Sequence, residues 1–307
     1  MTTVFIDGSV GTTGLRIADR LALRNDLKLL TLSEETRKDS AARKEAINSA
    51  DIVFLCLPDP AAIEAVSLTK NPAVKIIDTS TAHRTHPDWT YGMPELCGQR
   101  ERIANSHRIA NPGCHASGFI ALVAPLIEQG LLKADVALSC FSLTGYSGGG
   151  KKMIAEYESA DRSPLLKAPR QYALSQQHKH LKEMISVCGL KTAPVFCPIV
   201  ADFHSGMEVT VPVFANNLTG TKQDIEQLYA SYYKGGLIRF DNTTDPDGML
   251  SAAAFADRDD LQVSVQGNDE RILLTARFDN LGKGASGAAI QNMNILLGVD
   301  EATGLNV

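Results

Sequence analysis

One cysteine in this 307-residue chain stands where its side chain could act as a nucleophile. Cys114 ends the run Asn111-Pro112-Gly113-Cys114, and a long apolar segment over residues 119–127 follows. We expect Asn111 to cap a buried helix and Pro112 to lie in its first turn, the positions that these residue types favour. Cys114 would then lie at the positive end of the helix dipole, where the pKa of a thiol is lowered and the thiolate reacts. The alternative is a structural cysteine, because free cysteines are among the most buried residues.

Two histidines further along the chain are candidates for moving a proton. His178 and His180 are two positions apart, which puts them on different faces of a helix, so we expect at most one of them to face a given site. Neither has a cysteine or carboxylate at a spacing typical of zinc, and the six cysteines form no CxxC pair, so we expect no metal. A surface histidine, or one satisfied in the core, is the alternative.

A glycine-rich turn near the start of the chain could bind a dinucleotide. It lies between an apolar segment over residues 3–7, which predicts a buried strand, and a segment with helical periodicity over residues 15–21. Glycines let the backbone approach a pyrophosphate at a helix N-terminus. The spacing is G-x-x-G-x-x-G instead of G-x-G-x-x-G, so a plain tight turn is the alternative. The expected binding residues are Gly8, Ser9, Gly11, Thr12, Thr13 and Gly14.

The end of the second predicted strand, residues 27–32, bears on the choice of cofactor. An NAD site usually has an acidic residue there to hold the ribose hydroxyls. This chain has Ser33 at that point, with Arg37 and Lys38 close behind, and a hydroxyl with two cations suits the 2′-phosphate of NADP. The adjacent Glu34 and Glu35 leave a solvated, charged helix start as the alternative.

Two further segments could hold an anionic substrate. Arg84 follows Ser80 and Thr81 at the end of a predicted strand and could hold a phosphate or carboxylate through two hydrogen bonds, although a surface arginine would look the same. Residues 145–152 combine several glycines with two lysines, which could cradle an anion through backbone N–H groups or form a flexible turn. The candidate substrate residues are Arg84, Ser147, Gly148, Gly149, Lys151 and Arg170.

The order of the predicted elements indicates an α/β protein. Apolar strands at residues 50–57 and 74–78 alternate with helical segments, which favours right-handed βαβ units and a parallel sheet that binds ligands at the carboxyl ends of its strands. Alternating segments in the second half, at residues 194–198, 207–214, 261–266 and 271–278, predict antiparallel strands with one exposed face.

Composition excludes several classes of protein. The chain is 44% apolar and 21% charged, with a net charge of −5 and no cluster of basic residues, so we expect no nucleic-acid partner. No apolar run reaches the roughly 18 residues that a membrane span needs. The absence of a signal peptide and of paired cysteines predicts a cytoplasmic protein with reduced thiols.

The sequence resembles the N-acetyl-gamma-glutamyl-phosphate reductase family, in particular its shorter form, nearly from end to end. Asn111-Pro112-Gly113-Cys114 is the most specific of the matching motifs. One departure is Lys182, where the family has proline after the histidine pair. The other matching segments are residues 8–14, 80–84, 91–96, 145–150, 178–180 and 279–285.

That resemblance implies a fold and a reaction. It implies a Rossmann NADP-binding domain over residues 1–113 and 282–307, and an α+β catalytic domain like that of glyceraldehyde-phosphate dehydrogenase over residues 114–281. The small residues at 282–289 suit a last helix that returns to the Rossmann half. The reaction would be the NADPH-dependent reduction of N-acetyl-glutamyl 5-phosphate to the 5-semialdehyde in arginine biosynthesis, by a homo-oligomer, dimeric or tetrameric.

The resemblance also implies residue roles. Cys114 corresponds to the nucleophile that forms a thioester, and one histidine of the pair, His178 in preference to His180, to the acid/base residue. Asn280 would lie at the nicotinamide end of the cofactor. The nearest rival is aspartate-semialdehyde dehydrogenase, which uses the same chemistry on a shorter substrate. A non-enzymatic NADP-binding sensor of the same fold is the rival from another class.

Overall fold

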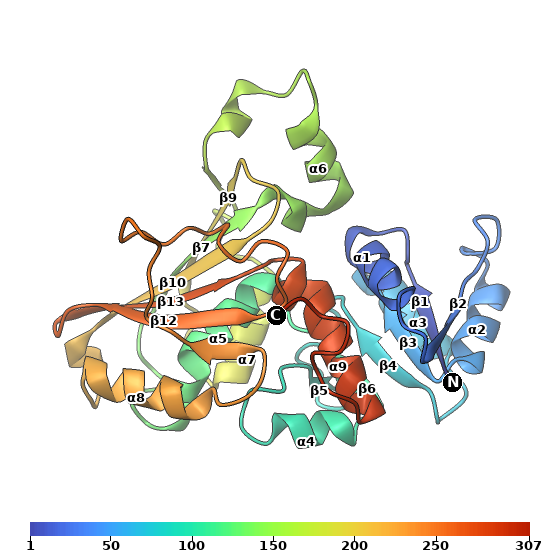
Figure 1. The fold of residues 1–307 in the computed structure, drawn as a ribbon, viewed down its shortest axis with the longest axis horizontal. Coiled ribbons are helices and arrows are strands. Elements are labelled where there is room, and N and C mark those ends of the chain that lie inside the picture. Colours follow the sequence, from blue (N-terminus) through green and yellow to red (C-terminus); the bar gives the residue numbers. More distant parts are fainter. The chain divides into compact units, whose positions relative to one another are not determined.

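A computed structural model describes all 307 residues, which form two compact units. Unit 1 comprises Met1–Pro112 and Ala285–Leu305, and unit 2 comprises Gly113–Gly284 and Asn306–Val307. Figure 1 shows the strands and helices of each unit. No helix combines the length and the apolar character that crossing a membrane requires.

Unit 1 contains a six-stranded parallel sheet with the strand order β2-β1-β3-β4-β6-β5. The predicted parallel, Rossmann-type sheet is therefore confirmed. The order reverses between β1 and β3, which places the loop after β1 at the switch point where such sheets bind ligands. The strands are β1 (Thr2–Asp7), β2 (Leu27–Leu30), β3 (Ile52–Leu55), β4 (Lys75–Asp78), β5 (Thr90–Tyr91) and β6 (Arg108–Ala110).

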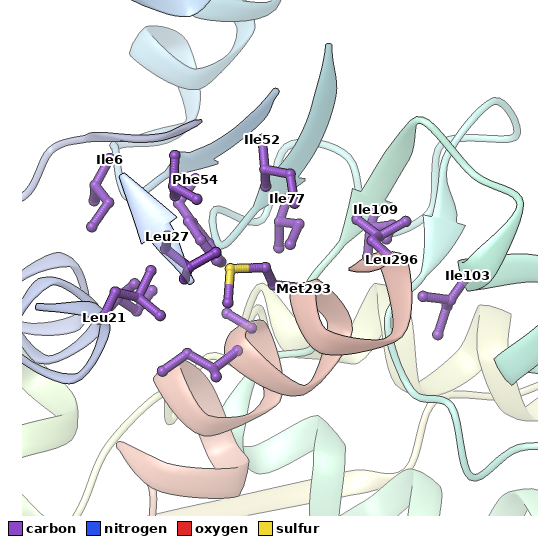
Figure 2. Packing of buried hydrophobic residues seen from close by; sticks show 14 residues of the cluster. Ile6, Leu21, Leu27, Ile52, Phe54, Ile77, Ile103, Ile109, Met293 and Leu296 are labelled. Atoms are coloured by element: carbon purple, nitrogen blue, oxygen red, sulfur yellow. The ribbon is translucent and has the colours of Figure 1, made fainter. Parts of the chain in front are cut away.

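Helices cover both faces of this sheet because its central strands are apolar on both sides. In β3, Val53 and Leu55 pack in the core beneath α2 and α3, whereas Ile52 and Phe54 join α1 and α9. Figure 2 shows Ile52 and Phe54 pointing toward Met293 of α9, so the last helix returns to this unit as expected. The helices are α1 (Thr12–Leu21), α2 (Ser40–Ser49), α3 (Asp59–Leu68), α4 (Gln99–Ala104) and α9 (Gly287–Leu297).

Unit 2 contains a seven-stranded mixed sheet with the order β11-β12-β13-β10-β7-β9-β8. The expectation of purely antiparallel strands is wrong for β9, which pairs with β7 in parallel. An alternating pattern of apolar and polar residues indicates that one face of a strand is exposed, but it does not give the direction of the strand. The long connection through α6 and α7 lets β9 run in the same direction as β7. The strands are β7 (Ser139–Gly145), β8 (Arg170–Gln171), β9 (Val195–Ala201), β10 (Met207–Phe214), β11 (Ile238–Phe240), β12 (Leu261–Gly267) and β13 (Arg271–Phe278).

The central helix of unit 2 is α5 (Cys114–Glu128), which is buried along nearly its whole length. It lies close to the sheet at Gly118, where an added Cβ would come within 2.6 Å of Val209 and 2.8 Å of Phe278. The other helices are α6 (Gly150–Glu158), α7 (His180–Cys188) and α8 (Lys222–Tyr232). On the opposite face of the sheet, Phe141, Val195, Phe214 and Leu273 stay between 41% and 59% exposed in the single chain.

The glycine-rich segment that follows β7 is helical. Tyr146–Gly149 forms a short 3-10 helix and α6 continues from it, so the flexible turn considered for residues 145–152 is wrong. Figure 1 shows α6 standing away from the sheet of its own unit. Gly150, with φ of +73°, supplies the left-handed backbone between the two helices, a conformation that glycine adopts readily.

Candidate active site

Helix α5 begins at Cys114 itself, two residues later than the sequence suggested. Gly113 occupies the N-cap with an extended backbone and no side-chain cap, so the assignment of Asn111 as the cap is wrong. Asn111 belongs to unit 1, where its side-chain amide donates to the Ala285 carbonyl at 3.0 Å and accepts from Asn292 at 3.3 Å. Those bonds occupy the side chain that would have capped the helix. Cys114 still lies in the first turn, as expected.

The space around Cys114 is restricted by neighbouring backbone. The cysteine is half-buried, and an added Cβ on Gly284 would lie 3.0 Å from the Cys114 Cβ. The Gly113 N–H just before it donates to Glu183 Oε2 at 3.2 Å. The sulfur is therefore held on the first residue of a rigid, buried helix whose start is tied to a carboxylate.

Both histidines of the predicted pair lie together in unit 2. Their ring centroids are 4.7 Å apart, and each lies 5.6 Å from the ring of His115. The expectation that at most one of them faces a given site is wrong, because α7 begins at His180 and the helical spacing does not reach back to His178. The backbone N–H of His180 donates to His178 Nδ1 at 3.2 Å, which holds the His178 ring next to the His180 ring.

Glu183 is a site residue that the sequence did not reveal. It is 1% exposed, and its Oε1 lies 4.0 Å from His180 Nε2 while its Oε2 accepts the Gly113 N–H. A buried carboxylate needs such partners. Its spacing of three residues from His180 was the one available signal, because residues three apart share a helix face.

His115 and Tyr172 also escaped the sequence analysis. His115 follows Cys114 on α5 and is 3% exposed, with Nδ1 2.6 Å from Ser142 Oγ and Nε2 2.6 Å from Tyr172 Oη. Burial, with a smaller effect of His178, lowers the pKa of His115 to about 3. Burial raises the pKa of Tyr172, and the charge of the Cys114 thiolate raises it further. Cys114 therefore has neutral hydrogen-bonding side chains beside it.

The candidate substrate residues of unit 2 fall into two groups. Ser147 is buried, and its hydroxyl accepts from Asn280 Nδ2 at 2.9 Å, while Asn280 Oδ1 accepts from the Gly206 N–H. Asn280 is therefore held in a fixed orientation by two bonds. The exposed residues of the set are Gly148, Gly149, Lys151 and Arg170.

Arg84 lies in unit 1, at the end of the β4 segment. Its Nε donates to the Asn111 carbonyl at 2.9 Å and its Nη2 to the Thr79 carbonyl at 3.1 Å. These bonds hold the guanidinium group against the backbone of two loops, where a rigid cation can face an anion.

The glycine turn of unit 1 fits a pyrophosphate. Gly8 has φ of +90°, and an added Cβ would come within 2.3 Å of the Cys56 carbonyl; one on Gly14 would come within 2.4 Å of the Gly8 carbonyl. Helix α1 begins after Gly11 without a side-chain cap, so its first N–H groups are available to an anion. The buried Thr12 hydroxyl has no hydrogen-bond partner in the protein. The tightly packed turn thus leaves hydrogen-bond donors for a phosphate.

A pocket at the ends of β1 and β2 lies next to this turn. Asp7, Ser9 and Arg37 are among the residues that line it. The Arg37 guanidinium is one-third exposed and lies 3.5 Å from Glu34, and the exposed Ser33 hydroxyl bonds Thr36 at 2.9 Å. A hydroxyl and a cation are thus placed at the end of β2, as expected.

No group of three or more histidine, cysteine, aspartate or glutamate side chains is placed to hold a metal ion. All six cysteines are free thiols. Cys140 and Cys188 are buried and Cys56 is half-buried, and burial raises the pKa of each, to about 12 for Cys56.

Comparison with known families first defines a class. Residues 3–106 match the NAD binding domain of semialdehyde dehydrogenase, and residues 114–280 match the semialdehyde dehydrogenase dimerisation domain. An aspartate semialdehyde dehydrogenase II from Vibrio cholerae, solved with its ligand ASA, has a TM-score of 0.73 at 16% identity over 97% of this chain and 98% of its own. The enzyme from Candida albicans, solved with NADP, has a TM-score of 0.69 at 15% identity over 97% and 98%. These likenesses show the fold.

Sequence relatives then narrow the class. The N-acetyl-gamma-glutamyl-phosphate reductase 2 of a Nostoc species is 45% identical over 98% of both chains, and that of Pseudomonas putida is 44% identical with the same coverage. The reductase of Burkholderia cenocepacia is 43% identical, again over 98% of each. The chain belongs to the N-acetyl-gamma-glutamyl-phosphate reductase family.

Proposed function

We propose that this protein reduces N-acetyl-L-glutamyl 5-phosphate to N-acetyl-L-glutamate 5-semialdehyde and phosphate, with NADPH as the reductant, in arginine biosynthesis. The relatives named for this reaction match the chain from end to end. The structural observation that carries the proposal is Cys114 at the first position of α5, in the same unit as the histidine pair and Glu183. A nucleophile, a base and a group that orients the base are the parts that acyl transfer needs.

The first step forms a bond between the Cys114 sulfur and the acyl carbon. The thiol proton passes to a histidine as the sulfur attacks, the bond between the acyl carbon and the phosphate oxygen breaks, and the histidine returns the proton to the departing phosphate. When bound, NADPH supplies the hydride that reduces the thioester carbon. The carbon–sulfur bond then breaks, which releases the aldehyde, and the sulfur takes up a proton from solvent to restore the Cys114 thiol.

His180 suits the role of the base better than His178 does. His178 Nδ1 accepts a hydrogen bond from the backbone N–H of His180. The proton of a neutral His178 therefore lies on Nε2, and its one basic nitrogen, Nδ1, is already occupied. His180 turns Nε2 toward the Glu183 carboxylate, 4.0 Å away, which favours a proton on that nitrogen and leaves Nδ1 basic. We therefore assign the acid/base role to His180, in place of the preference for His178 drawn from the sequence.

The cofactor is proposed to bind unit 1 through the glycine turn and the end of β2. The pyrophosphate would contact the turn from Gly8 to Gly14, with Ser9, Thr12 and Thr13 as further donors. Ser33 and Arg37 would hold the 2′-phosphate of NADP. Asn280, fixed by Ser147 and Gly206, is proposed for the nicotinamide end. A kcat/KM for NADPH well above that for NADH is expected, and the opposite order would refute the preference.

Arg84, Lys151 and Arg170, with residues 147–149, are proposed to hold the phosphate and carboxylates of the substrate. The two compact units and the two matched domains support a proposal in which residues 1–113 with 282–307 bind the cofactor and residues 114–281 contain the catalytic residues.

The protein is also proposed to be a cytoplasmic homo-oligomer, a dimer or tetramer. The matched dimerisation domain and the exposed apolar side chains on one sheet face support this assembly. These exposed apolar side chains are Phe141, Val195, Phe214 and Leu273.

The deciding experiment assays the reverse, phosphate-dependent oxidation of both semialdehydes with NADP. We expect turnover of N-acetyl-glutamate semialdehyde, whereas turnover of aspartate semialdehyde alone would make the protein an aspartate-semialdehyde dehydrogenase. Cys114→Ser should abolish the reaction and leave NADP binding intact, because serine is a far weaker nucleophile at neutral pH. A Cys114→Ser variant with full activity, or a wild-type protein that binds NADP without any turnover, would point to a sensor.

A further inference from the structure

The carboxylate of Asp78 lies at the end of β4 and is fully buried. Its Oδ1 accepts a hydrogen bond from the backbone N–H of Ser80 at 2.9 Å, and its Oδ2 accepts one from the Ser80 hydroxyl at 2.7 Å. His83 Nδ1 lies 2.6 Å from the same Oδ2. A carboxylate only accepts hydrogen bonds, so Nδ1 of His83 carries a proton and donates it to this bond. One side chain thus closes the turn over residues 78–83 through three hydrogen bonds.

The single tryptophan of the chain packs against this turn. Trp89 stacks on the buried His83 ring, with the ring centroids 4.1 Å apart and the ring planes inclined by 14°. The backbone links the two residues as well, because the His86 N–H donates to the His83 carbonyl and the Trp89 N–H to the His86 carbonyl, both at 3.1 Å. The fluorescence of Trp89 therefore reports whether His83 is held in place.

Arg84 follows His83 directly, and its side chain is bound to groups that adjoin Asp78. Its Nη2 donates to the carbonyl of Thr79, the residue after Asp78, and its Nε donates to the Asn111 carbonyl. The Asn111 N–H in turn donates to the Asp78 carbonyl at 2.8 Å. Nε and Nη2 share one edge of the planar guanidinium group, so the two bonds fix its plane. The backbone of Arg84 and both carbonyls that hold its side chain are thus attached to Asp78, directly or through one residue.

We propose that Asp78 is a positioning residue for Arg84, which it holds in the orientation that binds an anionic group of the substrate. The contact between Arg84 and the substrate rests on the proposed function. Asp78 itself contacts no substrate, because its side chain is fully buried. An arginine that is already held in place loses less conformational entropy when the anion binds. Loss of the Asp78 carboxylate should therefore weaken substrate binding and leave the chemical step unchanged.

Two variants loosen the turn to different degrees. Asp78→Asn keeps the size of the side chain, but its amide presents an N–H₂ donor where the carboxylate has an acceptor, so at least one of the three donors loses its partner. Ser80→Ala removes one donor only and is the milder variant should Asp78→Asn fail to fold. Both variants leave a second attachment intact, since the Thr81 N–H donates to Asp59 Oδ1 at 2.9 Å and the Thr81 hydroxyl donates to Oδ2.

A matched control is available in the same unit. The Asn48 side chain accepts two backbone N–H groups and donates to two carbonyls, all within residues 44–48 and 68–71. These segments precede β3 and β4, whereas Asp78 lies at the end of β4. Asn48→Ala therefore removes a set of polar contacts in unit 1 that has no bond to the turn over residues 78–83. An effect that Asn48→Ala shares with Asp78→Asn reports general loosening of unit 1.

The first measurement is the rate at which trypsin cuts the native full chain after Arg84, read by mass spectrometry. The exposed Lys234 serves as the internal reference, and the exposed residues 85–88 make the bond after Arg84 accessible. Trypsin must draw the arginine side chain into its own specificity pocket, so a guanidinium group bound to carbonyls slows the cut. Asp78→Asn should raise the ratio of the two rates about 10-fold, because part of a buried hydrogen-bond network is lost.

Ser80→Ala should raise the same ratio by less, and Asn48→Ala should leave it at the wild-type value. Acrylamide quenching of Trp89 fluorescence should increase in Asp78→Asn and in Ser80→Ala, because the stacked His83 ring is released. Increased quenching in Asp78→Asn without faster cutting after Arg84 would show that Asp78 holds His83 alone, and it would overturn the proposal.

The second measurement is a double-mutant cycle in the reverse assay with phosphate and N-acetyl-glutamate semialdehyde. Arg84→Gln should raise the KM of the substrate whose anionic group Arg84 holds. Asp78→Asn should raise the same KM about 10-fold and keep kcat within about threefold. In the Arg84→Gln background, Asp78→Asn should change that KM no further, because the group that it positions is absent. An equal increase in both backgrounds would give Asp78 a structural role only and overturn the proposal.

Proteolysis and fluorescence need no substrate, so they separate the two proposals. If the wild-type protein lacks the proposed activity but Asp78→Asn speeds the cut after Arg84, the proposed function fails and Asp78 still holds Arg84. If the wild-type protein is active and the cut is unchanged in Asp78→Asn, the positioning role fails and the proposed function stands.

Discussion

Two helices in this protein begin in the same way but differ in the groups that surround their first turn. Both α1 and α5 start directly after a glycine in an extended conformation and have no side-chain cap. At α1 the neighbouring glycines bring no side chain to the helix end, and the first turn has no side-chain cap. At α5 the N–H of Gly113 is taken by Glu183, and the first residue of the helix is Cys114.

The difference shows that a helix terminus is an anion site only where the surrounding side chains leave it open. Unit 1 offers uncapped backbone donors, which suit a phosphate group. Unit 2 places Cys114 at the same position, where we expect the helix dipole to favour its thiolate. Binding in unit 1 and chemistry in unit 2 should therefore be separable by mutation.

The largest expected effect lies in unit 2. His180→Asn should lower kcat by on the order of 10²–10⁴, because the proposed base for the Cys114 proton is lost. The Kd for NADPH, measured by fluorescence titration, should stay unchanged. His178→Asn is the matched variant and should cost less, since its Nδ1 is already occupied by the His180 N–H. If His178→Asn proves the more damaging of the two, the acid/base role belongs to His178.

A smaller effect with the opposite pattern is expected in unit 1. A methyl group on Gly14 would lie 2.4 Å from the Gly8 carbonyl, whereas one on Gly11 would lie 3.4 Å from it. Overpacking of the first kind costs about 1–3 kcal/mol, so Gly14→Ala should raise the Kd for NADPH roughly 10- to 100-fold. Gly11→Ala should change it less than about threefold.

Cys114 alkylation at saturating iodoacetamide serves as the control for these glycine variants and should match the wild type in both. An equal loss of NADPH binding in the two variants would mean that the turn responds to any side chain and not to the contact with Gly8. Loss of alkylation in Gly14→Ala would mean that binding and chemistry are not separable.

Most of the fold was accessible from the sequence because it rests on local patterns. The buried strands of unit 1 are continuous apolar runs, and the glycine turn lies within a few residues of the strand and helix that it joins. Pairing direction in unit 2 was not accessible, since β7 and β9 lie far apart in the chain and an exposed face is compatible with either direction.

The candidate site residues divide in the same way, into those that belong to a local motif and those that depend on a distant segment. Cys114 and the histidine pair were found because each is part of a contiguous motif. Ser142, Tyr172 and Glu183 were missed because their significance depends on a partner from a distant segment. The start of α5 was misplaced for a related reason. Asn111 has the right residue type for a cap, but Ala285 and Asn292 from the far end of the sequence bind its side chain.

The smallest expected effect concerns stability, and it tests whether His115 is neutral in the folded protein. Its pKa is about 3 in the folded state against 6.5 when exposed, so the unfolded chain binds one more proton between these values. A depressed pKa of this kind contributes stability that is present above pH 6.5 and lost as the pH falls toward 3. The loss amounts to at most about 1.4 kcal/mol per pH unit for one proton. His115→Gln should remove that part of the dependence, so urea unfolding of wild type and variant should converge between pH 7 and pH 5. Parallel curves would show that His115 is charged when folded.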